Sequence, residues 1–213
     1  RALRSPIFIL SILVAFIAYS IIVFGITFNP AYLIKVKGLS EQHAANVIAI
    51  SGLIGALLGI FLAFCSDRLY KKTQSLWTSR ILFTGICVIL AGILYALYPL
   101  VNGSGSIIII LSLVNALVVT INTLNPAIVI SLLPERRGVM AGTYYGIMTS
   151  SGIVAPIIFG QLIQTSGTNA AGGFDTSIYG MSVAMAIAAI LVFLFGKPKQ
   201  RVTTENDHKI VNL

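Results

Sequence analysis

The chain has 213 residues, of which 57% are hydrophobic and only 9% are charged. Soluble globular domains carry about 25% charged residues, so the composition excludes an ordinary soluble domain and indicates an integral membrane protein. The formal net charge of +8 does not indicate a nucleic-acid partner, because the basic residues flank apolar segments and form no basic domain of their own.

Six apolar segments are long enough to cross a lipid bilayer, which takes about 20 residues of helix. None of them contains Asp, Glu, Lys or Arg, and none alternates in polarity as a barrel strand would. The sequence therefore predicts an all-α integral membrane protein with six transmembrane helices. In chain order the segments are Pro6 to Phe28, Ala44 to Cys65, Ile81 to Leu100, Ser106 to Leu133, Val139 to Ile163 and Ser177 to Phe195.

The charged residues between these segments predict the orientation in the membrane. Of the 14 Lys and Arg residues, Lys35 and Lys37 lie on one side, and the other twelve lie on the opposite side. Cytoplasmic loops are enriched in Lys and Arg, so both termini are expected in the cytoplasm, with the protein in the plasma membrane. Residues 1–196 are expected to form a membrane domain, and residues 197–213 a cytoplasmic C-terminal tail.

The six segments differ in kind, in an order that repeats. The first and fourth carry polar residues near mid-membrane, the second and fifth carry small residues four apart, and the third and sixth are the most uniformly apolar. Repeats of three spans have opposite orientations in the membrane, and such inverted repeats are typical of secondary transporters. Small residues let helices approach closely, whereas buried polar groups need a partner or a water-filled cavity.

Hydroxyl and amide groups on the first, fourth and fifth segments are candidates for binding a small polar solute, because they can hydrogen-bond a carboxylate or a sugar. The alternative interpretation is that they only brace neighbouring helices. None of the segments contains His, Asp or Glu, so no catalytic acid–base pair, metal site, cofactor or enzyme activity is expected. The candidates are Tyr19, Ser20, Asn115, Asn122, Asn125, Tyr145 and Thr149.

The stretch AFCSDRLYKK, from Ala63 to Lys72, joins the second and third segments. Asp67 continues the line of small residues at the cytoplasmic end of the second segment, where a carboxylate can meet the N-terminus of a neighbouring helix. The basic residues after it, Arg68, Lys71 and Lys72, are expected to contact anionic lipid head groups. The alternative is that Asp67 and Arg68 form a solvated charge pair, which contributes little to stability.

This stretch resembles the signature Gly-x-x-x-Asp-Arg/Lys-x-Gly-Arg/Lys-Arg/Lys that follows the second helix of each half in the major facilitator superfamily. Asp67, Arg68 and the two lysines match, whereas Ala63 and Tyr70 stand where glycines are usual. The stretches PERRGVMAG and GIVAPIIFGQLI, between residues 134 and 163, resemble the penultimate helix of that family.

The resemblance implies half of a major facilitator fold, namely helices seven to twelve of a twelve-helix transporter that works by alternating access. A missing N-terminal half would be its partner, with Asp67 in a cytoplasmic gating contact and Arg137 near the equivalent aspartate of that half. Gly142 and Gly146 would lie on a helix between the halves.

The stretch NPAYLIKVKGLSEQHAANVIAISGLIGALLG, residues 29–59, together with SDRL, resembles the anion:cation symporter branch, which carries organic acids. Monocarboxylate, oxalate and cyanate permease branches look similar at this level. The expected function is secondary active transport of a small organic anion, and the alternative is a non-transporting scaffold or receptor on the same fold.

Overall fold

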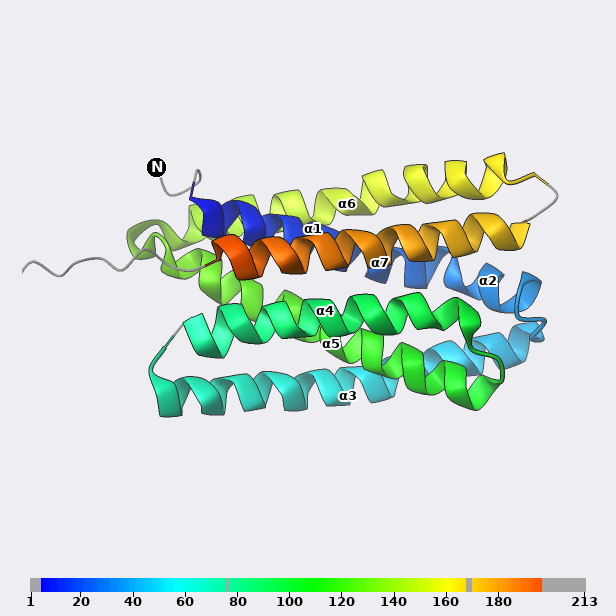
Figure 1. The fold of residues 1–213 in the computed structure, drawn as a ribbon, viewed down its shortest axis with the longest axis horizontal. Coiled ribbons are helices and arrows are strands. Elements are labelled where there is room, and N and C mark those ends of the chain that lie inside the picture. Colours follow the sequence, from blue (N-terminus) through cyan, green and yellow to red (C-terminus); the bar gives the residue numbers. More distant parts are fainter. Residues whose placement is uncertain (1–4, 76, 168–169, 197–213) are drawn as a thin grey trace, which may run out of the picture.

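Seven α-helices run through the part of the chain that this computed structural model describes, residues 5–75, 77–167 and 170–196 (Figure 1). A π-helical segment, Trp77–Leu82, precedes α4, and short 3₁₀ turns at Tyr98–Leu100 and Pro134–Arg136 follow α4 and α5. The helices are α1 (Pro6–Thr27), α2 (Asn29–Lys35), α3 (Glu41–Thr73), α4 (Phe83–Leu97), α5 (Ser104–Ser131), α6 (Arg137–Thr165) and α7 (Ala170–Phe195).

Six helical runs are long and apolar enough to span a membrane, which confirms the predicted number of spans. The third of these runs, Thr78–Leu100, joins α4 to most of the π-helical segment before it and to the 3₁₀ turn after it. Local signals set several of their ends. The hydroxyl groups of Ser5 and Ser40 accept hydrogen bonds from backbone N–H groups in the first turns of α1 and α3, as N-cap residues do. The tail predicted at residues 197–213 lies outside the described residues.

The structure differs from the sequence analysis at the end of the second span. The stretch from Ser66 was expected to be a link, but α3 runs on for eight more residues to Thr73 and ends at Gln74, whose φ is 52°. Asp67 and Tyr70 therefore lie on a helix. The left-handed residue that reverses the chain is Gln74, four positions after the usual glycine position that Tyr70 occupies.

The packing of the helices confirms two inverted three-helix repeats, formed by α1, α3 and α4 and by α5, α6 and α7. Helix α3 packs on α5 as α6 packs on α1, and α4 packs on α5 as α7 packs on α1. The contacts of α1 with α5 and of α4 with α7 join helices that hold the same place in the two repeats, and the contact of α6 with α7 corresponds to that of α3 with the π-helical start of the third span. Exchanging the repeats therefore leaves this set of contacts unchanged, as a two-fold relation requires.

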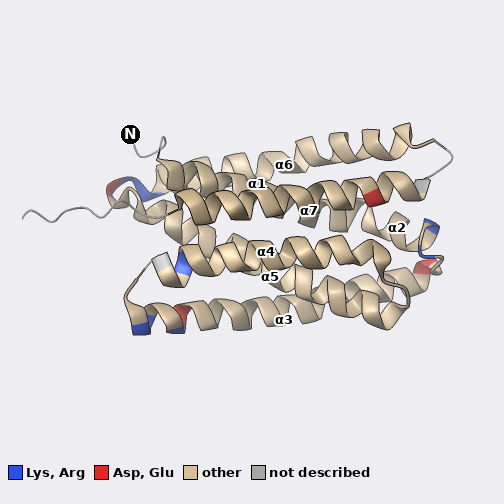
Figure 2. Cartoon of the chain, in the orientation of Figure 1, with Lys and Arg blue, Asp and Glu red and all other residues tan. Residues whose placement is uncertain are grey.

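The second helix of each repeat lies at the edge of the structure. Figure 1 shows α6 and α3 on opposite flanks, with α1, α7, α4 and α5 between them. Only 22% of the most apolar stretch of α3 and of α6 is buried, against 56% of that of α5. Charged residues lie at the two ends of the bundle, as Figure 2 shows. The flanking helices thus present long apolar faces that the described residues do not cover.

Candidate functional site

A cavity of about 440 Å³ opens between α1 and α3. Helices α4 and α5 form its floor, and α2 lies at one end. Space arises here because α1 and α3 do not pack closely, whereas their counterparts α5 and α6 do. Gly25 and Gly52 widen it, since a Cβ atom on either would meet nothing within 4 Å. The lining is apolar apart from a few polar groups, chiefly Asn29, Ser51 and Asn115.

Asn115 gives this cavity a free amide. It comes from α5 and makes no hydrogen bond with any residue that the structure describes, whereas Ser51 already donates to the carbonyl of Ile48. The backbone of Asn115 is held in place because Gly55 of α3 lets α3 and α5 approach closely. A Cβ atom at Gly55 would lie 2.6 Å from that of Asn115. Asn115 can therefore donate to and accept from a bound molecule.

Asn122 lies two helical turns from Asn115, on nearly the same face of α5. Both atoms of its amide are buried and lack a hydrogen-bond partner among the described residues. Pro126 has no N–H to donate, so the Asn122 carbonyl also loses its usual helical partner. Burial of an amide without a hydrogen-bond partner costs free energy, and in native proteins such groups generally hydrogen-bond to protein or to ordered water.

Asn125 and Ser20 are turned into the protein. The Asn125 side chain is only 2% exposed, and its Nδ2 donates to the carbonyl of Ser11 in α1 at 3.1 Å. Ser20 is also buried, and its hydroxyl donates to the carbonyl of Phe16 at 2.9 Å. The structure therefore does not bring these two groups to the cavity between α1 and α3.

Tyr19, Tyr145 and Thr149 lie on the side of the molecule where α1 meets α6. Tyr19 is partly buried, and a Cβ atom at Gly152 of α6 would lie 3.8 Å from its ring. Tyr145 is 46% exposed. Thr149 is exposed, although its hydroxyl donates to the carbonyl of Tyr145 at 2.7 Å. None of these three residues lines the cavity that contains Asn115.

The small residues of α3 and α6 have different surroundings. Gly55 and Gly59 pack against α5, where added Cβ atoms would lie 3.0 Å or less from its side chains. Gly142 and Gly146 are exposed, and a Cβ atom on either would meet nothing within 4 Å. The small residues of α3 thus serve packing within this chain, whereas those of α6 leave an open surface.

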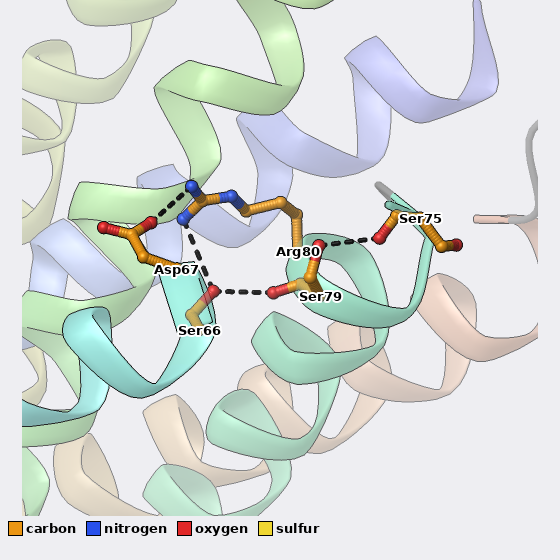
Figure 3. A network of polar contacts seen from close by, with 5 residues as sticks. All are labelled: Ser66, Asp67, Ser75, Ser79 and Arg80. Atoms are coloured by element: carbon orange, nitrogen blue, oxygen red, sulfur yellow. Dashed lines mark hydrogen bonds and ion pairs between the residues drawn. The ribbon is translucent and has the colours of Figure 1, made fainter. Parts of the chain in front are cut away.

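Figure 3 shows a polar network at the end of the bundle where α3 meets the π-helical segment. Arg80 forms an ion pair with Asp67, with Nη2 and Oδ1 2.5 Å apart, and its Nη1 lies 3.4 Å from the Ser66 hydroxyl. Ser66 donates in turn to the carbonyl of Ser79 at 2.6 Å. The Arg80 guanidinium also lies over the ring of Tyr70, 5.9 Å from its centroid.

Arg80 was not among the residues singled out from the sequence. The sequence feature that could have identified it is its position as the last charged residue before the third apolar segment, 13 positions after Asp67. The other basic residues nearby, Arg68, Lys71 and Lys72, are exposed and make no ion pair within the described part of the chain. Arg137 is also exposed, and its Nε donates to the carbonyl of Pro134 at 3.2 Å.

Comparison with known proteins finds transporters whose sequences are similar to that of this chain. A probable sulfoacetate transporter of Cupriavidus necator is 32% identical over 154 residues, which cover 67% of this chain and 33% of the relative. A hexuronate transporter of Bacillus subtilis is 22% identical over 188 residues, covering 86% and 44%. A probable galactarate/D-glucarate transporter of the same organism is 29% identical over 175 residues, covering 80% and 36%. The chain thus spans less than half the length of each of these relatives.

The family model described as Major Facilitator Superfamily matches residues 1–156, which is more than half of the chain. This match agrees with the Asp-Arg stretch at the end of α3 and with the two inverted repeats of three helices. The chain therefore belongs to the major facilitator superfamily.

Proposed function

We propose that this chain is the C-terminal half of a secondary transporter that carries a small organic anion across the plasma membrane by alternating access. The observation that carries the proposal is the cavity between α1 and α3, with the free amide of Asn115 on its floor. The three relatives are named for sulfoacetate, hexuronate and galactarate or glucarate, all of which are carboxylates.

The described residues can supply hydrogen bonds to such a solute but not its counter-charge. Asn115 and Asn122 offer amide donors, and Tyr19, Tyr145 and Thr149 offer hydroxyl groups on the α6 side. No Lys, Arg or His lies within the apolar stretches of the six spans. A cation that neutralises the carboxylate must then come from a second, N-terminal half, as must an acidic residue for proton coupling.

The exposed flanks of α3 and α6 are the surfaces that we assign to this second half. Gly142 and Gly146 offer it a close approach, because small residues let backbones come together where lipid provides no hydrophobic driving force. The network of Asp67 and Arg80 would hold the end of α3 at the cytoplasmic gate. Arg137, at the start of α6, would lie at the same gate, with both chain termini in the cytoplasm.

Uptake of a labelled hexuronate or glucarate by vesicles that contain the complete transporter tests this proposal. We expect Asn115→Ala and Asn122→Ala to raise the apparent KM at matched protein levels. Ile109→Ala is the control, because Ile109 lies on the same helix with its side chain 62% exposed. Equal uptake by all three variants would argue against a solute site on α5, and solute binding without uptake would favour the receptor alternative.

A further inference from the structure

A second polar network lies at the end of the bundle opposite the Asp67–Arg80 pair, and the function proposed above does not use it. It comprises Asn29, Tyr32, Lys37, Tyr98 and Asp175, together with two backbone carbonyls. We propose that this network is a latch that holds α2 in place as the end wall of the cavity, and that Lys37 is a positioning residue for solute access. The part of this inference that concerns solute rests on the proposed function.

Lys37 joins the segment after α2 to the turn between α4 and α5. Its Nζ donates to the carbonyls of Pro99 and Val101, at 2.6 and 2.9 Å. These carbonyls follow a helix end, where backbone acceptors lack helical partners. The same ammonium group lies 5.7 Å from the ring centroid of Tyr32. One side chain thus satisfies two orphan carbonyls and contacts the aromatic residue at the centre of α2.

Tyr32 joins α2 to the second repeat. Its side chain is fully buried, and its hydroxyl donates to Oδ1 of Asp175 in α7 at 3.1 Å. Burial, followed by the nearby Asp175 carboxylate, raises the pKa of Tyr32, so this hydroxyl stays protonated and remains a donor. The Tyr32 ring packs against Tyr98 and Phe174, with centroids 5.2 and 5.6 Å away.

A third bond closes the latch on the side of the cavity. The Tyr98 hydroxyl, which is fully buried, donates to Oδ1 of Asn29 at 2.6 Å. Asn29 and the neighbouring Pro30 both line the cavity. The contacts of Tyr32, Lys37 and Tyr98 therefore all act on α2 or on the segment directly after it, and they fix this short helix to the turn after α4 and to α7.

The backbone shows why α2 needs such contacts. The first span ends at Thr27, and a separate helix of seven residues begins at Asn29, just before Pro30. Because Pro30 cannot donate a backbone hydrogen bond, the connection between α1 and α2 is weakened at this point. The position of α2 then depends on its side-chain contacts, and with it the width of the cavity at this end.

Chemical labelling of a cysteine in the cavity tests the latch without requiring transport. Gly25→Cys is a suitable reporter in the full-length transporter lacking Cys65 and Cys87, because Gly25 lines the cavity and a Cβ atom there meets nothing within 4 Å. The probe is a membrane-impermeant maleimide added from outside. We expect Tyr32→Phe to speed labelling about two- to tenfold, the effect of losing one such hydrogen bond, and Lys37→Met, which loses two, to speed it at least as much.

The matched control is Lys35→Met, which removes an exposed cation from α2 without touching the latch. Lys37→Arg, which can still donate to both carbonyls, should restore slow labelling. Tyr32→Phe removes only a hydroxyl group, so it tests the latch even if Lys37→Met fails to fold. Labelling rates of Lys37→Met and Tyr32→Phe that equal the rate of Lys35→Met would overturn the latch.

Uptake kinetics give a second readout that a loss of folded protein would not reproduce. Release of α2 should change the apparent KM, whereas a lower amount of folded transporter would reduce only the maximal rate. Faster labelling without any uptake of solute would leave the latch standing and count against the proposed function. Unchanged labelling together with normal uptake would overturn the latch and leave the proposed function standing.

Discussion

Three asparagines on α5 show how far surroundings decide the role of one residue type. Among the described residues, Asn115 lines the cavity with a free amide, the Asn122 amide is buried without a partner, and Asn125 bonds to the backbone of α1. Asn122 and Asn125 are only three residues apart, yet only the second braces a neighbouring helix. Stability and transport should therefore respond differently to their removal.

Asn125→Ala is expected to lower the stability of the complete transporter by about 1 kcal/mol, the usual size of a hydrogen bond between membrane helices. Asn122→Ala should leave stability unchanged or raise it, because it removes a buried amide that has no partner, while it weakens uptake. Thermal unfolding in detergent and uptake at matched expression measure the two effects. A loss of stability in Asn122→Ala as large as that in Asn125→Ala would show that Asn122 also braces helices.

The ion pair of Asp67 and Arg80 also shows how the surroundings of a residue determine its contribution. The Arg80 side chain is 15% exposed and that of Asp67 is 56% exposed, so solvent screens their interaction. A double-mutant cycle with Asp67→Ala and Arg80→Ala should give a coupling energy of at most about 1 kcal/mol. A coupling of several kcal/mol would mean that the complete transporter buries this pair.

The charge of Asp67 was evident from the sequence, but its partner was not. The partner depends on α3 continuing to Thr73 and on the π-helical segment that carries Arg80. Likewise, the asparagines of α5 were identifiable as polar groups at membrane depth, whereas their separate roles were not. Helical spacing fixes the direction of a side chain relative to its own helix but not which neighbouring helix it will meet.

At the scale of the helices, α3 and α6 carry similar small residues with different uses. Gly55 and Gly59 allow α3 to approach α5, whereas Gly142 and Gly146 of α6 face open space. Four-residue spacing predicted a close-packing face on both helices. It could not show that the described residues fill one of these faces and leave the other open, because the pattern is the same in either case.

Gly55→Leu and Gly146→Leu should therefore have opposite profiles. A side chain at Gly55 would collide with Asn115 and the Ser112 backbone, and overpacking of this kind costs about 1–3 kcal/mol of stability. Gly146→Leu should fold normally but reduce uptake, because it separates α6 from the second half and biases the conformational equilibrium. About 1.4 kcal/mol of such bias shifts that equilibrium tenfold.

Unfolding in detergent separates the two substitutions, and uptake by vesicles shows the effect on transport. Gly52→Leu is a useful companion, since this glycine of α3 has open space and lines the cavity. Normal uptake by Gly146→Leu would place this face of α6 against lipid instead of the second half.

At the scale of the whole molecule, the distribution of charge and the packing of the helices agree with the same arrangement of spans. The described basic residues lie at both ends of the bundle (Figure 2), with only Lys35 and Lys37 at the end that holds the latch. The order of polar, small-residue and apolar spans predicted the inverted repeats that the helix contacts confirm. The difference between the α1–α3 pair and the α5–α6 pair was not predictable, because it is a property of the conformation.

The orientation in the membrane stays a prediction, and two exposed lysines can test it. Lys35→Cys should react with an impermeant maleimide in intact cells, whereas Lys71→Cys should react only after the cells are permeabilised. Both side chains are exposed in the structure, so a missing reaction would not be caused by burial. Reaction of Lys71→Cys in intact cells would reverse the assignment of both ends.

The proposed function requires a second, N-terminal half, and the surfaces of this chain predict that it needs that partner for transport. Large apolar side chains on both flanks are left uncovered, with Leu57 and Phe61 of α3 each 61% exposed and Ile153 of α6 70% exposed. The apolar stretches of the spans also contain no cation that could stabilise an organic anion within the membrane. Vesicles that contain this chain alone should therefore show no solute-dependent uptake. Co-expression with six N-terminal spans should restore it, and Gly146→Leu should weaken that recovery more than Ile109→Leu, the control at an exposed position of α5. Uptake by this chain alone would mean that it builds a complete pathway from its own copies.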